Sequence, residues 1–108
     1  MSPEEALALI RGGESATVEL KPESEYQTTL AEALAALANS AAGTPATIFV
    51  GVQDQPIVIR EISDLKAVTD RLYSAARQVH PPLHDLITVE PIRIEERTVV
   101  AAHVLVEG

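Results

Sequence analysis

Hydrophobic residues along this chain recur with helical spacing in some segments and with strand spacing in others. Two long segments carry apolar residues at every third or fourth position, which predicts helices over about 26–41 and 64–79. A shorter helix is predicted to start at Pro3, where Ser2 and Glu5 form a capping box, and to end at Gly12-Gly13. The pattern therefore predicts one short and two long helices.

Strand character is found in five segments, at 17–21, 46–52, 57–59, 86–94 and 98–106. The segment 46–52 is a continuous apolar run, which predicts a strand buried on both faces, and Gly51 within it indicates a bend or a close backbone approach. Pro91 indicates an edge position or a bulge. Residues 95–97 fit a hairpin loop between the last two strands.

The order of these elements predicts an α+β fold, a mixed β-sheet with about three helices packed on it. A chain of 108 residues is long enough for one hydrophobic core but short for two. We therefore expect a single domain over 1–108, with an N-terminal helix in 1–12 and the core in 13–108.

The charge and composition limit the kinds of partner. The formal net charge is −8, from 16 acidic and 8 basic residues, which argues against strong non-specific binding to nucleic acid but leaves room for a local basic patch. The chain has no cysteine, so disulfides and thiolate metal sites are excluded, and a reducing cytoplasm is compatible. The acidic N-terminus is not that of a signal peptide, and no apolar run is long enough to span a membrane. We expect a cytoplasmic protein without membrane contact.

Three short motifs follow one another on the predicted elements. Glu14 is followed after four residues by Glu19-Leu20-Lys21, the first long helix ends near Ala38–Gly43, and the buried strand ends in Gly51-Val52-Gln53-Asp54. In this order the motifs resemble the AlbA-like domain of Schlafen proteins and of bacterial regulators, among them RecG-related helicase-like, "divergent AAA" and predicted DNA-binding proteins. The resemblance runs from about residue 12 to 106, with Gln53 in place of the usual first aspartate of the last motif.

The resemblance implies a nucleic-acid (DNA) binding module of a bacterial transcriptional regulator or RecG-related helicase-like protein. It also implies that the chain is the N-terminal part of a larger protein with a further domain downstream. DNA and RNA remain alternatives as partners. A homodimer or interaction domain without catalysis is a further alternative, because AlbA-like folds commonly dimerise and the last hairpin offers a pairing edge.

Schlafen proteins with ribonuclease activity use three carboxylates for metal-dependent cleavage of RNA. The matching positions here are Glu14, Glu19 and Asp54, which the resemblance implies as catalytic residues and as ligands of Mg²⁺ or Mn²⁺. Such a cation activates water and neutralises phosphate charge. The alternative is that Glu14 and Glu19 are solvated surface groups and that Glu19 pairs with Lys21.

Four basic residues are candidates for contact with phosphate. Lys21 belongs to the first motif, and its candidate neighbours in space are Arg60, Arg71 and Arg77. The alternative for each is ordinary surface pairing, of the kind expected for Lys66 and Asp70 four positions apart on a helix.

Other kinds of chemistry find no support in the sequence. There is no glycine-rich phosphate loop with Gly-Lys-Ser/Thr, so no ATP-binding motor is expected. Pro81-Pro82 separates His80 from His84 and prevents a shared helical metal site. His103 lies in an apolar strand, where we expect a packing role, and no Ser-His-Asp arrangement is evident.

Overall fold

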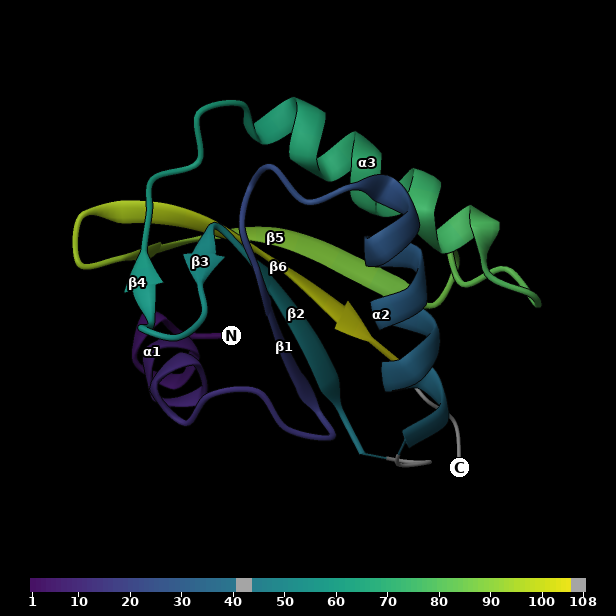
Figure 1. Cartoon of the computed structure of the whole chain (residues 1–108), viewed down its shortest axis with the longest axis horizontal. Helices are drawn as coiled ribbons and strands as arrows, with labels where there is room; N and C mark the ends of the chain where they lie inside the picture. Colours follow the sequence, from purple (N-terminus) through teal and green to yellow (C-terminus); the bar gives the residue numbers. More distant parts are fainter. Residues whose placement is uncertain (41–43, 106–108) are drawn as a thin grey trace.

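A computed structural model describes residues 1–40 and 44–105, which form one twisted sheet flanked by helices (Figure 1). The helices are α1 (Pro3–Arg11), α2 (Gln27–Ser40) and α3 (Leu65–Gln78). The strands are β1 (Val18–Lys21), β2 (Ala46–Val50), β3 (Val52–Gln53), β4 (Val58–Ile59), β5 (Ile87–Ile94) and β6 (Arg97–Val104). The predicted α+β class with a mixed sheet is confirmed.

Some expected features lie outside the described residues. These are the end of the first long helix at Ala41, the Ala42-Gly43 part of the second motif and the end of the last strand at Val106. In the described part of the chain, no helix combines the length and the apolar character needed to cross a membrane.

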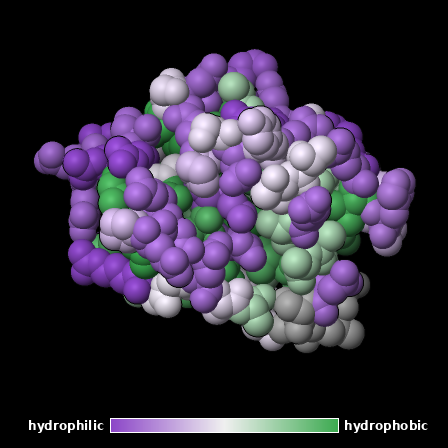
Figure 2. All heavy atoms as spheres, viewed as in Figure 1, coloured by the Kyte–Doolittle hydropathy of each residue, from purple (hydrophilic) through white to green (hydrophobic). Residues whose placement is uncertain are grey.

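The main sheet has the strand order β1-β2-β6-β5. β1 and β2 are parallel and are connected through α2, whereas β2 with β6 and β6 with β5 are antiparallel. β1 and β5 are therefore the two edges of the sheet, and the prediction that Pro91 lies at an edge is confirmed. The surface on the side viewed in Figure 1 is largely hydrophilic, with hydrophobic atoms gathered on the right over α2 (Figure 2).

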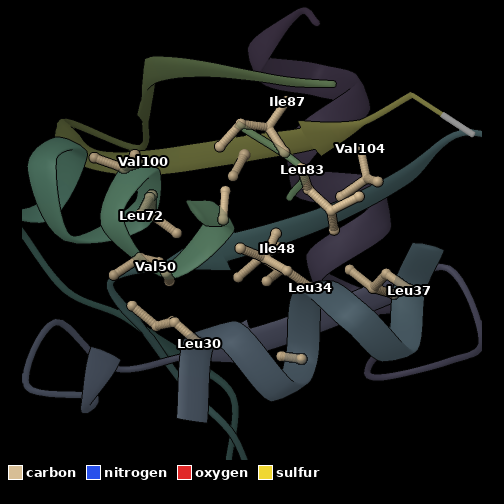
Figure 3. Close-up of a cluster of buried hydrophobic side chains, with 14 of the residues drawn as sticks. Leu30, Leu34, Leu37, Ile48, Val50, Leu72, Leu83, Ile87, Val100 and Val104 are labelled. Atoms are coloured by element: carbon tan, nitrogen blue, oxygen red, sulfur yellow. The ribbon is translucent and has the colours of Figure 1, made fainter. Parts of the chain in front are cut away.

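Helices cover both faces of the sheet. On one face, α2 and α3 pack on alternate residues of β2 and β6, where Leu34 and Leu72 meet Ile48 and Val100 (Figure 3). On the other face, Ile10 of α1 belongs to a cluster with Val18, Leu20 and Phe49. Because strand side chains alternate between faces, Glu19 and Lys21 lie on the α2–α3 side of the edge strand β1.

The predicted strand over 46–52 is wrong beyond Val50, where Gly51 interrupts it at φ +105°. The next residues leave the main sheet and form β3, which pairs with β4 in a small ribbon. A Cβ atom at Gly51 would stand 2.9 Å from Ile62 Cδ1, so the expected bend and close approach are both confirmed.

Three further sequence predictions can be compared with the structure. The loop predicted at 95–97 is a two-residue turn, because Glu95 and Glu96 take φ values of 50° and 66° and β6 already begins at Arg97. Leu65, an apolar residue within the predicted helix over 64–79, starts the first turn of α3 and is 41% exposed. Arg71, a candidate for phosphate contact or surface pairing, has its guanidinium partly buried against a loop.

Candidate functional site

The connection between α1 and β1 folds back along the open edge of β1. Gly13 takes φ +77°, which turns the chain, and Ser15 N–H then donates to the Val18 carbonyl at 2.9 Å. The Leu20 N–H, which points away from β2, donates to Glu14 Oε2 at 3.1 Å. This bond occupies part of an exposed strand edge and places the Glu14 carboxylate beside Glu19.

Glu14 and Glu19 have opposite pKa shifts because their carboxyl groups interact. Burial, together with the hydrogen bond and negative charge of Glu14, raises the pKa of Glu19 to about 7, and the Lys21 ammonium opposes this only in part. The hydrogen bond from Glu19 lowers the pKa of Glu14 despite some burial, with help from the Leu20 amide, Lys21 and Asp54. The pair therefore keeps one proton to a higher pH than a free glutamate would.

Asp54 completes the acidic group. It lies half-buried in the turn between β3 and β4, close enough to Glu14 to help lower the pKa of that carboxyl group. The three carboxylates that the sequence singled out thus come together, with Glu14 between Glu19 and Asp54. We refer to Glu14, Glu19 and Asp54 as the carboxylate cluster.

The carboxylate cluster has the donor type that Mg²⁺ and Mn²⁺ prefer, since both are hard cations that bind oxygen. Two of its carboxylates nevertheless already have partners within the protein. Leu20 N–H donates to Glu14, and the Lys21 ammonium lies 3.7 Å from Glu19 Oε2. Across residues 1–40 and 44–105, no three acidic or histidine side chains are arranged to hold a metal ion. A metal at these residues stays a prediction.

Gly51 joins the backbones of Lys21 and Arg60. Gly51 N–H donates to the Lys21 carbonyl, and the Arg60 N–H donates to the Gly51 carbonyl, both at 2.8 Å. The Arg60 guanidinium donates to Gln53 Oε1 at 3.0 Å. Gly51, Gln53 and Arg60 line a hollow of about 320 Å³ that Pro22 and Glu23 also border. Two of its lining residues are sequence neighbours of the candidate site residues: Pro22 follows Lys21, and Gln53 precedes Asp54.

The other two basic candidates are placed differently. Arg71 donates to the backbone carbonyls of Glu23 and Glu25, at 2.6 and 2.8 Å, so its guanidinium holds the loop between β1 and α2. Arg77 is exposed in the last turn of α3. Lys66 and Asp70 form the expected pair at 2.7 Å.

Sequence reasoning missed two residues that shape this region. Gln53, noted only as a departure from the usual motif, is the side chain that positions Arg60. Glu23 accepts bonds from Ser63 N, Ser63 Oγ and Asp64 N at 2.9, 2.8 and 3.0 Å, which fixes the entry to α3. The place of Gln53 in the third motif could have identified it. Nothing in the sequence marks Glu23, because its partners lie about 40 positions away.

The expectation of a purely packing role for His103 is wrong. Its Nδ1 lies 2.9 Å from Thr47 Oγ1, and its Nε2 lies 2.5 Å from Glu90 Oε2, so it links three adjacent strands through polar contacts. Thr47 is buried at 4% exposure, so this chain of groups offers no accessible nucleophile.

Comparison with known proteins identifies the fold and the family. The N-terminal domain of a RecG-related protein from Nitrosomonas europaea superposes with a TM-score of 0.74 at 17% identity, covering 100% of this chain and 74% of that one. The DIP2311 protein from Corynebacterium diphtheriae gives 0.63 at 15% identity, covering 96% of this chain and 25% of that one. No curated protein is detectably similar in sequence.

The family model described as "Schlafen, AlbA_2" matches residues 14–106, which begins at Glu14 and includes the whole carboxylate cluster. The resemblance inferred from the three motifs is thereby confirmed. The chain belongs to the Schlafen AlbA_2 family.

Proposed function

We propose that this domain binds nucleic acid, as one module of a DNA-acting protein of the regulator or RecG-related helicase-like kind. The observation that carries the proposal is the position of the carboxylate cluster and Lys21 at the edge strand β1, with Arg60 joined to Lys21 through the backbone of Gly51 and bordering a hollow. Family membership supports it, since the structural neighbour from Nitrosomonas europaea is described as related to a DNA helicase. In this proposal, Lys21 and Arg60 contact phosphates.

The acidic groups near Lys21 oppose the binding of phosphate. Lys21 is already paired with Glu19, and Glu14 and Asp54 add negative charge close by. A phosphate approaching this edge is attracted by two cations and repelled by the carboxylates. Binding at the edge should therefore be weak at physiological salt and should strengthen as salt is lowered.

The binding test compares the whole chain with its variants Lys21→Gln and Arg60→Gln, using fluorescence anisotropy with labelled tRNA and duplex DNA at low salt. Each variant should weaken binding and lower the slope of log affinity against log salt by about 1. Lys66→Gln, which removes an exposed lysine on α3, is the matched control. Equal affinity for wild type and both variants would contradict the proposed contacts.

The second candidate function is a divalent-metal-dependent endoribonuclease of the Schlafen type. The contact of Glu14 with both Glu19 and Asp54 favours it, because crowded carboxylates with a raised pKa are typical of sites that take up a cation. A bound Mg²⁺ or Mn²⁺ would supply charge neutralisation and an activated water. The protein's part would be to hold the three carboxylates in place and to orient phosphate through Lys21.

Cleavage of tRNA with Mn²⁺ or with EDTA separates the two functions. The nuclease hypothesis expects Mn²⁺-dependent products that disappear in Glu19→Gln and persist in Glu32→Gln, an exposed residue of α2. Binding without any metal-dependent cleavage would reject the nuclease and leave the binding module. A third candidate, pairing of two copies through the open edge of β5, would be seen as a dimer in sedimentation.

A further inference from the structure

The β3–β4 ribbon borders a second hollow besides the one next to Arg60. This hollow has a volume of about 480 Å³. Its walls come from three parts of the chain that are distant in sequence: Leu7 and Arg11 of α1, Ile57 and Ile59 at β4, and Glu95 and Arg97 at the β5–β6 turn. We refer to it as the ribbon hollow.

The floor of the ribbon hollow is apolar and its rim is charged. Ile57 is 37% exposed although it is a large hydrophobic residue, and Leu7 and Ile59 are half-buried around it. On the left of Figure 2, over β4, hydrophobic atoms are surrounded by hydrophilic ones. An apolar floor with a few convergent polar groups is the usual character of a ligand site.

Two of the three charged residues that line the hollow are arginines. Arg11 Nη2 lies 3.0 Å from Glu95 Oε1, in a pair whose side chains are 68% and 49% exposed. Arg97 is exposed, and within the described part of the chain no carboxylate lies within ion-pair distance of it. Among the residues that line the hollow, two guanidinium groups thus face one carboxylate, while Glu96 lies in the same turn and Glu61 accepts from the Thr98 amide next to Arg97.

The Arg11–Glu95 pair does not close the hollow to an anion. Exposed ion pairs contribute little to stability, so a ligand phosphate can replace Glu95 as the partner of Arg11 at little cost. Arg11 also lies in the last turn of α1, where the helix carbonyls favour a cation and keep its side chain near the rim. A guanidinium binds phosphate through two parallel hydrogen bonds, which a lysine does not reproduce.

We propose that the ribbon hollow is a second contact site for a single-stranded nucleic acid. Phosphates bind Arg97 and Arg11, and a sugar or base face lies on Ile57 and Leu7. This inference rests on the proposed function and supplies what the carboxylate edge lacks, an exposed arginine that forms no ion pair within the described residues. The hollow's volume suits a nucleotide rather than a folded partner, since pockets of roughly 300–1,000 Å³ hold small ligands.

The test follows backbone amide and arginine side-chain NMR signals of the whole chain while a short oligouridylate is added at low salt. Shifts at Arg11, Ile57 and Arg97 are expected. Arg97→Glu should weaken binding about tenfold, the loss typical of one charge-assisted hydrogen bond, and Arg11→Gln should weaken it less. Lys66→Glu changes the charge equally on exposed α3 and is the control that should retain binding.

The other outcomes distinguish this inference from the proposed function. Shifts confined to Lys21, Arg60 and their neighbours would overturn the ribbon hollow as a contact site and leave the proposed function intact. No shifts anywhere would overturn both. Binding of polyglutamate in the hollow at lower concentration than oligouridylate would assign it to an acidic peptide and overturn the inference.

Discussion

The carboxyl groups of Glu14 and Glu19 lie close enough at the open edge of β1 to shift each other's pKa in opposite directions. Glu14 is held there by the Leu20 amide, and Glu19 is fixed by its place in the strand. Glu14 cannot move away from Glu19 without breaking its bond to the Leu20 amide. The raised pKa of Glu19 therefore depends on the way the α1–β1 connection folds back along the strand.

Replacing Glu19 with glutamine should stabilise the protein at alkaline pH. The folded state raises the pKa of Glu19 from 4.5 to about 7, so it binds this proton more tightly than the unfolded chain does. Stability from this group is therefore present at low pH and is lost as pH rises from 4.5 to about 7. Glu19→Gln should gain on the order of 1–3 kcal/mol at alkaline pH, measured by urea denaturation.

The control for this prediction is Glu32→Gln, an exposed carboxylate on α2. It should leave the pH dependence of stability unchanged. If Glu19→Gln and wild type lose stability in parallel between acid and alkaline pH, the two carboxyl groups do not share a proton in solution.

Gly51→Ala should destabilise the fold and weaken the site. Its φ of +105° is strained for any side chain, and the new Cβ would stand 2.9 Å from Ile62 and 3.2 Å from the Arg60 carbonyl. A loss of roughly 2–4 kcal/mol is expected from strain and overlap together, measured by thermal or urea denaturation. Gly12→Ala is the matched control, because Gly12 has φ −70° and its nearest contact would be 3.4 Å.

Arg71→Ala should reduce stability without a specific effect on nucleic-acid binding. Its guanidinium joins α3 to the carbonyls of Glu23 and Glu25, and both acceptors would lose a charged donor. The expected loss is about 1–3 kcal/mol, against no more than about 1 kcal/mol for Lys66→Ala, whose pair is exposed. A variant that keeps full stability but loses affinity would instead make Arg71 a ligand contact.

Glu90→Gln should make the protein less sensitive to acid. Burial alone would raise the pKa of Glu90, but the hydrogen bond and charge of His103, with the N-terminal ammonium, keep it below its usual value. Stability from Glu90 is therefore present above its unfolded pKa and is lost as pH falls through the lower folded value. Because the side chain is 33% exposed, the acid-induced loss should shrink by no more than about 1 kcal/mol in the variant.

The sequence predicted what depends on neighbouring residues. The N-cap at Ser2, the hairpin turn near residues 95–97 and the edge position of Pro91 all follow from local backbone rules. The motif order also indicated that Glu14, Glu19 and Asp54 belong together, although it could not show that Glu14 reaches back to the Leu20 amide.

Features that join distant segments could not be predicted in this way. The bonds of Glu23 to residues 63–64, the contacts of Arg71 and the chain from Thr47 through His103 to Glu90 link positions 13 to 56 apart. In the sequence pattern, polar residues that form such contacts occupy the same positions between the apolar residues as polar residues that face solvent. Nothing in the pattern separates an Arg71 that faces a loop from an Arg77 that faces solvent.

The most direct measurement of the central claim is the salt dependence of nucleic-acid binding by the whole chain and by the double variant Lys21→Gln/Arg60→Gln. The account predicts binding of tRNA or duplex DNA by wild type at low salt, with a slope of log affinity against log salt that falls by about 2 in the double variant. Lys66→Gln should retain the wild-type slope. Equal slopes and affinities for wild type and the double variant, or no binding by wild type at low salt, would contradict the assignment of this sheet edge to nucleic acid.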